Sequence, residues 1–188
     1  MLIPVSDDCR LRILDEADAE EVYALVDTNR AFLSDWMPWA AEQTLERTVN
    51  FIRAAQERYA SRNGFEAGLI VGGRIAGCAG FPGVDWLARS TSIGYWLAEE
   101  HQGRGLMTRA VGALVEHAFS EWDLHRVEIR AATGNTRSRA IPERLGFTQE
   151  GVLREAELVG DEYQDLAVYG LVATKMSDVT GMPGARPK

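Results

Sequence analysis

Apolar residues recur three or four positions apart in four stretches of the chain, which is the spacing of a helix with one buried face. The first stretch follows Asp15, a residue type that commonly caps helix N-termini. Glycine and asparagine commonly end helices. The expected helices are one that begins after Asp15, one from about 44 to 59 that stops near Asn63-Gly64, one from about 105 to 121, and a short one from 136 to 145 that Gly146 terminates.

Other stretches alternate apolar with polar residues or form short apolar runs, as strands do. Gly72-Gly73 indicates a tight hairpin, and a polar turn at Gly160-Asp161 separates the last two strands. The order of elements predicts an α+β fold, in which a mixed sheet carries helices on both faces. One domain over residues 1–179 is expected, followed by a flexible Pro/Gly-rich tail over 180–188. The expected strands are 10–14, 65–71, 74–81, about 91–98, 124–131, 147–153 and 163–171.

Composition excludes several classes of protein. The chain has 188 residues, 46% of them hydrophobic, which is enough for one core. Its formal net charge of -8 disfavours a protein that grips nucleic acid. No apolar run reaches the length of a membrane span, and the N-terminus lacks the pattern of a signal peptide, so a cytoplasmic protein is expected. Cys9 and Cys78 are expected to be buried thiols, and the three histidines form no metal-ligand pattern.

The segment from Gln102 to Thr108 carries the clearest chemical signal. It contains Gly103 and Gly105, follows a strand-like run and opens a helix. Such a turn leaves several backbone N–H groups unpaired and pointing one way, which favours an anion such as a pyrophosphate. No lysine follows at the spacing of a nucleotide-binding P-loop. A dinucleotide fingerprint is disfavoured because Thr108 stands where its last glycine would, and because a hairpin precedes the turn.

The ordered set of motifs resembles the GNAT N-acetyltransferases, and within them the RimJ/RimL branch, which acetylates the N-termini of ribosomal proteins and assorted amines. The resemblance covers roughly residues 10 to 173. Each motif alone is weak, whereas the set at these spacings is specific. The motifs are Tyr95-Trp96-Leu97, His101 through Thr108, Leu124-His125-Arg126, Asn135-x-x-Ser138, Arg144-Leu145-Gly146-Phe147-x-x-Glu150-Gly151, and Tyr163-x-Asp165-x-x-x-Tyr169-x-Leu171.

This resemblance implies a mostly antiparallel central sheet with splayed central strands and a site for acetyl-CoA between them. It implies no metal, and it suggests a homodimer. The expected acceptor is the N-terminal amine of a protein, ribosomal or otherwise. Alternatives are a small amine, an aminoacyl-type antibiotic, or a CoA-binding sensor without catalysis. The implied cofactor contacts are Trp96, Leu97 and Ala98 along the pantetheine, Gln102, Gly103, Arg104, Gly105, Leu106, Met107 and Thr108 at the pyrophosphate, and Asn135 and Ser138 on the other side.

Two positions depart from the general pattern of the superfamily. Met107 fits the RimJ/RimL branch better than the superfamily at large. Pro142 occupies the position where many relatives carry a tyrosine general acid, so that mechanism cannot be carried over. Proline also lacks the N–H that would bond the carbonyl of Ser138, and its ring should kink the helix. The kink would present the Ser138 hydroxyl to the CoA sulfur, unless Ser138 is an ordinary first-turn residue.

Acetyl transfer needs a neutral amine. An α-amine, with a pKa of about 7.7–8.0, is roughly a tenth neutral at pH 7 and needs only a modest base. The resemblance places that base at Glu157, acting through water. Glu150 and Glu155 are rivals, and each of the three could be a solvated surface acid. Trp36 and Trp39 lie in the aromatic segment 32–39, expected to be an irregular loop that either plugs the core or walls the acceptor pocket.

Overall fold

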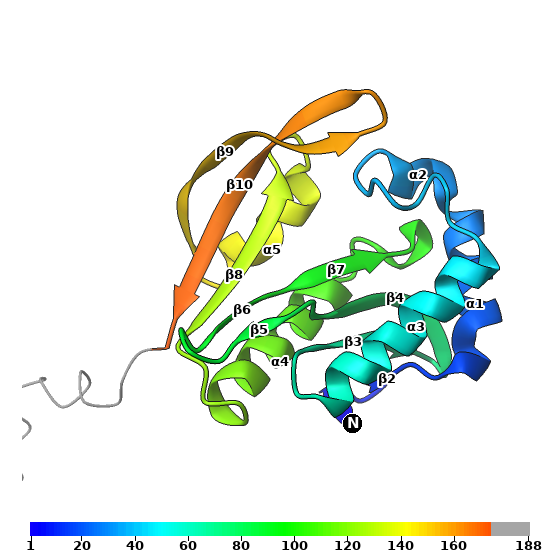
Figure 1. Cartoon of the computed structure of the whole chain (residues 1–188), viewed down its shortest axis with the longest axis horizontal. Coiled ribbons are helices and arrows are strands. Elements are labelled where there is room, and N and C mark those ends of the chain that lie inside the picture. Colours follow the sequence, from blue (N-terminus) through cyan, green and yellow to red (C-terminus); the bar gives the residue numbers. More distant parts are fainter. Residues whose placement is uncertain (174–188) are drawn as a thin grey trace, which may run out of the picture.

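The computed structural model describes residues 1–173, in which ten strands form two five-stranded sheets (Figure 1). Neighbouring strands are antiparallel except for the parallel pair β6–β8. The predicted α+β class is confirmed. The first sheet has the order β1 (Leu2–Ser6), β2 (Cys9–Ile13), β3 (Phe65–Val71), β4 (Arg74–Phe81), β7 (Gly94–Leu97). The second has the order β5 (Val84–Asp85), β6 (Ser90–Ser92), β8 (Arg126–Ala132), β10 (Glu162–Val172), β9 (Thr148–Val159).

The two sheets part at the strand expected over 91–98. Its first half, β6, pairs with β8, whereas its second half, β7, pairs with β4. The Ile93 amide between them still donates a hydrogen bond of 2.8 Å to the Glu128 carbonyl, and beyond it β7 leaves the second sheet. The expected splayed strands are therefore confirmed, and the opening lies between β7 and β8 (Figure 1).

Helices cover both faces of the first sheet, as predicted. On β3, Phe65, Ala67 and Leu69 pack in one core with α4 (Leu106–Ser120). Ile70 packs instead in a second core with α1 (Ala19–Thr28) and α3 (Leu45–Ala60). The alternation follows from the period of two in a strand. α5 (Thr136–Arg144) contacts β8 and β9 on the other side of the opening (Figure 1).

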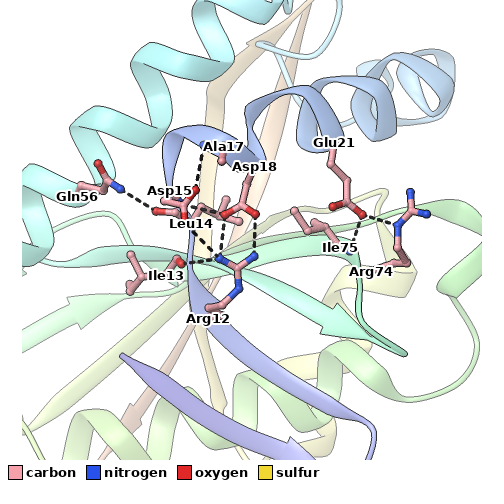
Figure 2. A network of polar contacts seen from close by, with 10 residues as sticks. All are labelled: Arg12, Ile13, Leu14, Asp15, Ala17, Asp18, Glu21, Gln56, Arg74 and Ile75. Carbon is pink, nitrogen blue, oxygen red and sulfur yellow. Dashed lines mark hydrogen bonds and ion pairs between the residues drawn. The ribbon is translucent and has the colours of Figure 1, made fainter.

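Polar contacts fix α1 and α3 to the sheet at the end of β2 (Figure 2). Asp15 is the expected cap, although it caps a 3-10 turn over Glu16–Asp18 that leads into α1. Both terminal nitrogens of Arg12 donate to the Asp18 carboxylate, at 2.9 and 2.7 Å. Gln56 of α3 donates to the Leu14 carbonyl at 3.1 Å, and Glu21 accepts from Arg74 of β4 at 2.7 Å. The helical layer thus has a fixed position over the sheet.

The structure also corrects several expectations about local elements. No strand was expected over Leu2–Ser6, which pairs with β2 as β1. A short helix, α2 (Arg30–Ser34), covers the beginning of the segment expected to be an irregular loop. β9 continues six residues past the expected end at 153, because backbone pairing with β10 carries it through exposed polar residues that give no apolar signal. α5 continues through Pro142 as a helix.

Two further expectations concern single residues and the chain's end. His117, expected on the polar face of its helix, is half-buried and lies edge-on to Phe65, with ring centroids 5.9 Å apart. Burial there lowers the pKa of His117. Cys9 and Cys78 are buried free thiols, as predicted. The expected tail over 180–188 lies outside the described residues, as does the end of the expected domain at 179.

Candidate active site

The turn before α4 has the backbone of an anion-binding site. Gly103 and Gly105 have φ angles of +72° and +69°, a region that residues with a side chain rarely adopt. Gly105 is the N-cap of α4, and no side chain caps the helix there. The first N–H groups of α4 therefore lack a side-chain partner, and the helix dipole adds positive charge at the same place. The turn can hold a phosphate group through its backbone.

A cavity of about 1060 Å³ adjoins this turn and runs between β7 and α5. Arg137 of α5 donates a hydrogen bond of 2.9 Å to the Gln102 side chain and so joins the two sides. Most of the expected cofactor contacts line this cavity, but Arg104 and Ala98 do not. Ala98 is fully buried, and its amide donates to the Ala76 carbonyl. The expected residues that line the cavity are Trp96, Leu97, Gln102, Gly103, Gly105, Leu106, Met107, Thr108, Asn135 and Ser138.

A second cavity, of about 520 Å³, lies on the other side of β7, toward α1 and α3. Trp36 and Trp39 line it, together with the carboxyl-bearing Glu66 and Glu157. Trp39 also meets Trp96 edge-on, with ring centroids 6.1 Å apart. The two cavities meet, because six residues line both of them: Trp36, Met37, Tyr95, Trp96, Asn135 and Ser138.

Ser138 stands at this junction, held by neighbours on two elements. The Asn135 side chain accepts a hydrogen bond of 3.0 Å from the Ser138 amide and caps α5. The Tyr95 hydroxyl lies 3.0 Å from the Ser138 hydroxyl and donates to the Ser138 carbonyl at 3.1 Å. That carbonyl lacks its helical donor because Pro142 has no N–H, so Tyr95 supplies a replacement. Burial raises the pKa of Tyr95 to about 12, which keeps the phenol neutral.

The three carboxyl groups weighed as the base lie in different places. Glu157, on β9, is half-buried and lines the second cavity, and burial raises its pKa. Glu150 instead forms an ion pair with Arg126, whose hydrogen bond holds the pKa of Glu150 below its usual value. Glu155 is exposed at a bulge, where its amide donates to Asp165. Of these three, only Glu157 faces a cavity.

Sequence reasoning missed several residues that line the two cavities. Tyr95 and Met37 at the junction were not singled out, nor was Arg137 in the larger cavity. Glu66 was also missed, although it is the one charged residue in the apolar run Phe65–Val71, a signal that could have found it. Burial raises the pKa of Glu66 to about 7, opposed by the charge of Arg58.

Two features of residues 1–173 bear on other classes of function. This part of the chain contains no group of three or more side chains arranged to hold a metal ion. No helix within this range combines the length and the apolar character that a membrane crossing requires.

Comparison with known proteins gives a consistent result. Residues 9–148 match the family model described as "Acetyltransferase (GNAT) domain". YdaF of Bacillus subtilis (strain 168) is 37% identical over 89% of this chain and 93% of its own length. The ribosomal-protein-serine acetyltransferase of Escherichia coli (strain K12) is 28% identical over 90% of this chain and 96% of its own. A structure of RimL, a ribosomal L7/L12 alpha-N-protein acetyltransferase in complex with coenzyme A, is 28% identical with a TM-score of 0.88, over 92% of this chain and 98% of that one.

Proposed function

We propose that this chain, which belongs to the GNAT acetyltransferase family, acetylates the N-terminal α-amine of a protein, most specifically of a ribosomal protein. It is an N-acetyltransferase, and acetyl-CoA is its donor. The identity of the acceptor is the part that we propose. It draws on relatives along the whole chain that are named for ribosomal-protein acetylation.

One observation carries the proposal for the site: two cavities of different character meet at Ser138. The larger cavity includes the glycine turn, whose backbone suits a pyrophosphate. The smaller cavity is lined by aromatic side chains and by Glu157, which suit the end of a peptide. A donor in one and an acceptor in the other would bring the thioester and the amine together at the junction.

The chain's residues can then perform acetyl transfer in the following way. Acetyl-CoA supplies the acetyl group as a thioester. Glu157 accepts a proton from the α-ammonium group through water, and the neutral amine bonds to the acetyl carbon as the carbon–sulfur bond breaks. Ser138, backed by Tyr95, donates its proton to the departing sulfur and regains one from the new amide nitrogen. The proton on Glu157 returns to solvent, so one proton is released for each amide formed.

We further propose that the protein acts in the cytoplasm and forms a homodimer, without metal, nucleic acid or membrane. Ribosomal proteins are available in that compartment. The edge strand β9 exposes Val152, Leu153 and Leu158, an apolar surface that a second copy could cover.

Acetyl transfer from labelled acetyl-CoA to synthetic peptides tests the proposed acceptor. A peptide with the N-terminal sequence of a ribosomal protein should become labelled, and the same peptide with a blocked α-amine should not. The Glu157→Gln enzyme should lose the acidic limb of its pH–rate profile. Label on lysine side chains or only on small amines would contradict the acceptor, and an unshifted profile would remove Glu157 as the base.

A further inference from the structure

Glu66 reaches the acceptor cavity along a path that two glycines leave open. It pairs with Gly80 on β4, and Gly80 pairs in turn with Gly94 on β7. A Cβ atom on Gly80 would lie 3.0 Å from Glu66 Oε2, so the carboxyl group lies directly over this glycine. Gly94 and Glu66 both line the cavity. The row of three residues therefore forms a floor on which the only side chain is a carboxylate.

The charges in the cavity are unequally compensated. Two arginines line it, and each already has a carboxylate partner: Arg47 pairs with Glu42 at 3.0 Å and Arg130 with Glu128 at 2.7 Å. By contrast, neither Glu66 nor Glu157 forms an ion pair within the part of the chain that the structure describes. The cavity thus offers two acidic groups in search of positive charge. Glu157 is assigned to the reacting amine, which leaves Glu66 over.

The groups around Glu66 come from several elements, and their effects oppose one another. Burial against the helical layer raises the pKa of the Glu66 carboxyl, and the charge of Arg58 on α3 lowers it, with a net value of about 7. The buried Cys78 thiol on β4 is also coupled to Glu66, which helps to raise the pKa of Cys78. The titratable and charged groups that line the cavity with Glu66 are Arg47, Tyr95, Arg130 and Glu157.

We propose that Glu66 forms a subsite for a second positively charged group of the acceptor, at the inner end of the cavity beyond the amine that is acetylated. This inference rests on the proposed function and narrows its substrate class. Strands lie about 4.8 Å apart, so Glu66 and Gly94 are separated by two strand spacings. The second cation must therefore stand several bonds from the reacting amine. A basic first side chain of a peptide, or the far end of a small diamine, has this chemistry.

Titration of Glu66 should make the selection depend on pH. A cation binds the ionised carboxylate better than the neutral acid, so selection should strengthen as the pH rises through about 7 and then level off. The reacting amine titrates in the same range. The selection must therefore be measured as a ratio between two acceptors that carry the same α-amine.

Peptides that begin with arginine or with citrulline provide that ratio, because the two side chains have nearly the same shape and only arginine is charged. The enzyme should show a kcat/KM ratio of arginine to citrulline of about ten or more at pH 8, and a smaller ratio at pH 6. Glu66→Gln should bring the ratio close to one at both pH values while CoA affinity stays unchanged. Glu116→Gln, at an exposed position on α4, is the matched control and should preserve the ratio.

Further arms separate the possible outcomes. Glu66→Asp keeps the charge and should retain part of the ratio. Comparing 1,4-diaminobutane with butylamine tests the diamine source, and a Glu66-dependent preference there alone would assign the subsite to small diamines. If the enzyme acetylates all the peptides and amines but the two ratios are near one, or if Glu66→Gln leaves them unchanged, the subsite is refuted and the proposed function survives. If nothing is acetylated, both fail.

Discussion

The two cavities that meet at Ser138 are built in different ways. The donor side centres on one continuous segment, Gln102 to Thr108, whose glycines and unpaired helical N–H groups face the larger cavity. The acceptor side is made of side chains from α1, α3, β3, β7, β8, β9 and the segment after α2. A site made by backbone tolerates little change in local conformation. A site made by side chains from many elements can change its specificity without changing the fold.

The largest effect should follow from a change in the donor turn. Gly105→Val places a β-branched residue at a φ of +69°, and its Cβ would lie 3.2 Å from the Arg109 side chain. We expect CoA affinity to fall about 100-fold or more, measured by calorimetry. Gly160→Val is a matched control, since Gly160 has a φ of +60° in the β9–β10 turn, away from both cavities. An equal loss of CoA affinity in both variants would show that general strain, and not the turn, is responsible.

The next largest effect should appear at the junction. Ser138→Ala removes the proposed proton donor and should lower kcat about 100-fold, with little change in CoA affinity. Tyr95→Phe removes the hydroxyl that contacts Ser138 at 3.0 Å and should lower kcat by a smaller factor. Ser120→Ala, at an exposed serine on α4, serves as the control in steady-state assays. An undiminished kcat in Ser138→Ala would remove Ser138 from the chemistry.

A smaller effect should separate the two cavities. Trp39 lines only the acceptor cavity, whereas Trp36 lines both. Trp39→Ala should therefore raise the acceptor KM about tenfold and leave the Kd for CoA unchanged, because it removes aromatic contact on one side alone. Trp36→Ala should weaken both. If Trp39→Ala weakens CoA as much as the acceptor, the two cavities do not act as separate sites.

The smallest effect concerns stability. Burial raises the pKa of Glu66 from 4.5 to about 7, so the folded chain binds more protons than the unfolded chain between these values. This carboxyl therefore lowers stability as the pH rises from about 4.5 to 7, and the cost stays constant above that. Glu66→Gln should raise stability by about 1–3 kcal/mol at pH 8, or a few degrees in Tm, and should have little effect at pH 4.5. An equal gain at both pH values would contradict the ionisation account.

The difference between the cavities also explains what the sequence could predict. The glycine turn is local, so its residues and their spacing are enough to identify the donor side. The splayed strands followed only from the family resemblance, because the division at Ile93 depends on pairing with β4 and β8, which are distant in sequence. Trp36 and Trp39 were expected at the acceptor pocket, and both line it.

The parts that could not be predicted depend on tertiary contacts. Tyr95 meets Ser138 across 43 positions of the chain, and no local pattern encodes that contact. Glu66 has the pattern of an ordinary strand residue, and its role depends on Gly80 and Gly94, which lie beside it only in the folded sheet. β9 was predicted too short because its last residues are exposed and are held by pairing with β10. Side chains that act across strands thus escape a prediction that relies on periodicity.

The central claim is that a donor and an acceptor bind in two cavities that meet at Ser138. A bisubstrate analogue, in which an acetyl linker joins the CoA sulfur to the α-nitrogen of an acceptor peptide, tests it directly by calorimetry. Because both halves can bind at once, the analogue should bind about 100-fold more tightly than CoA, and Trp39→Ala should remove most of that gain. An analogue that binds no more tightly than CoA alone would contradict the account.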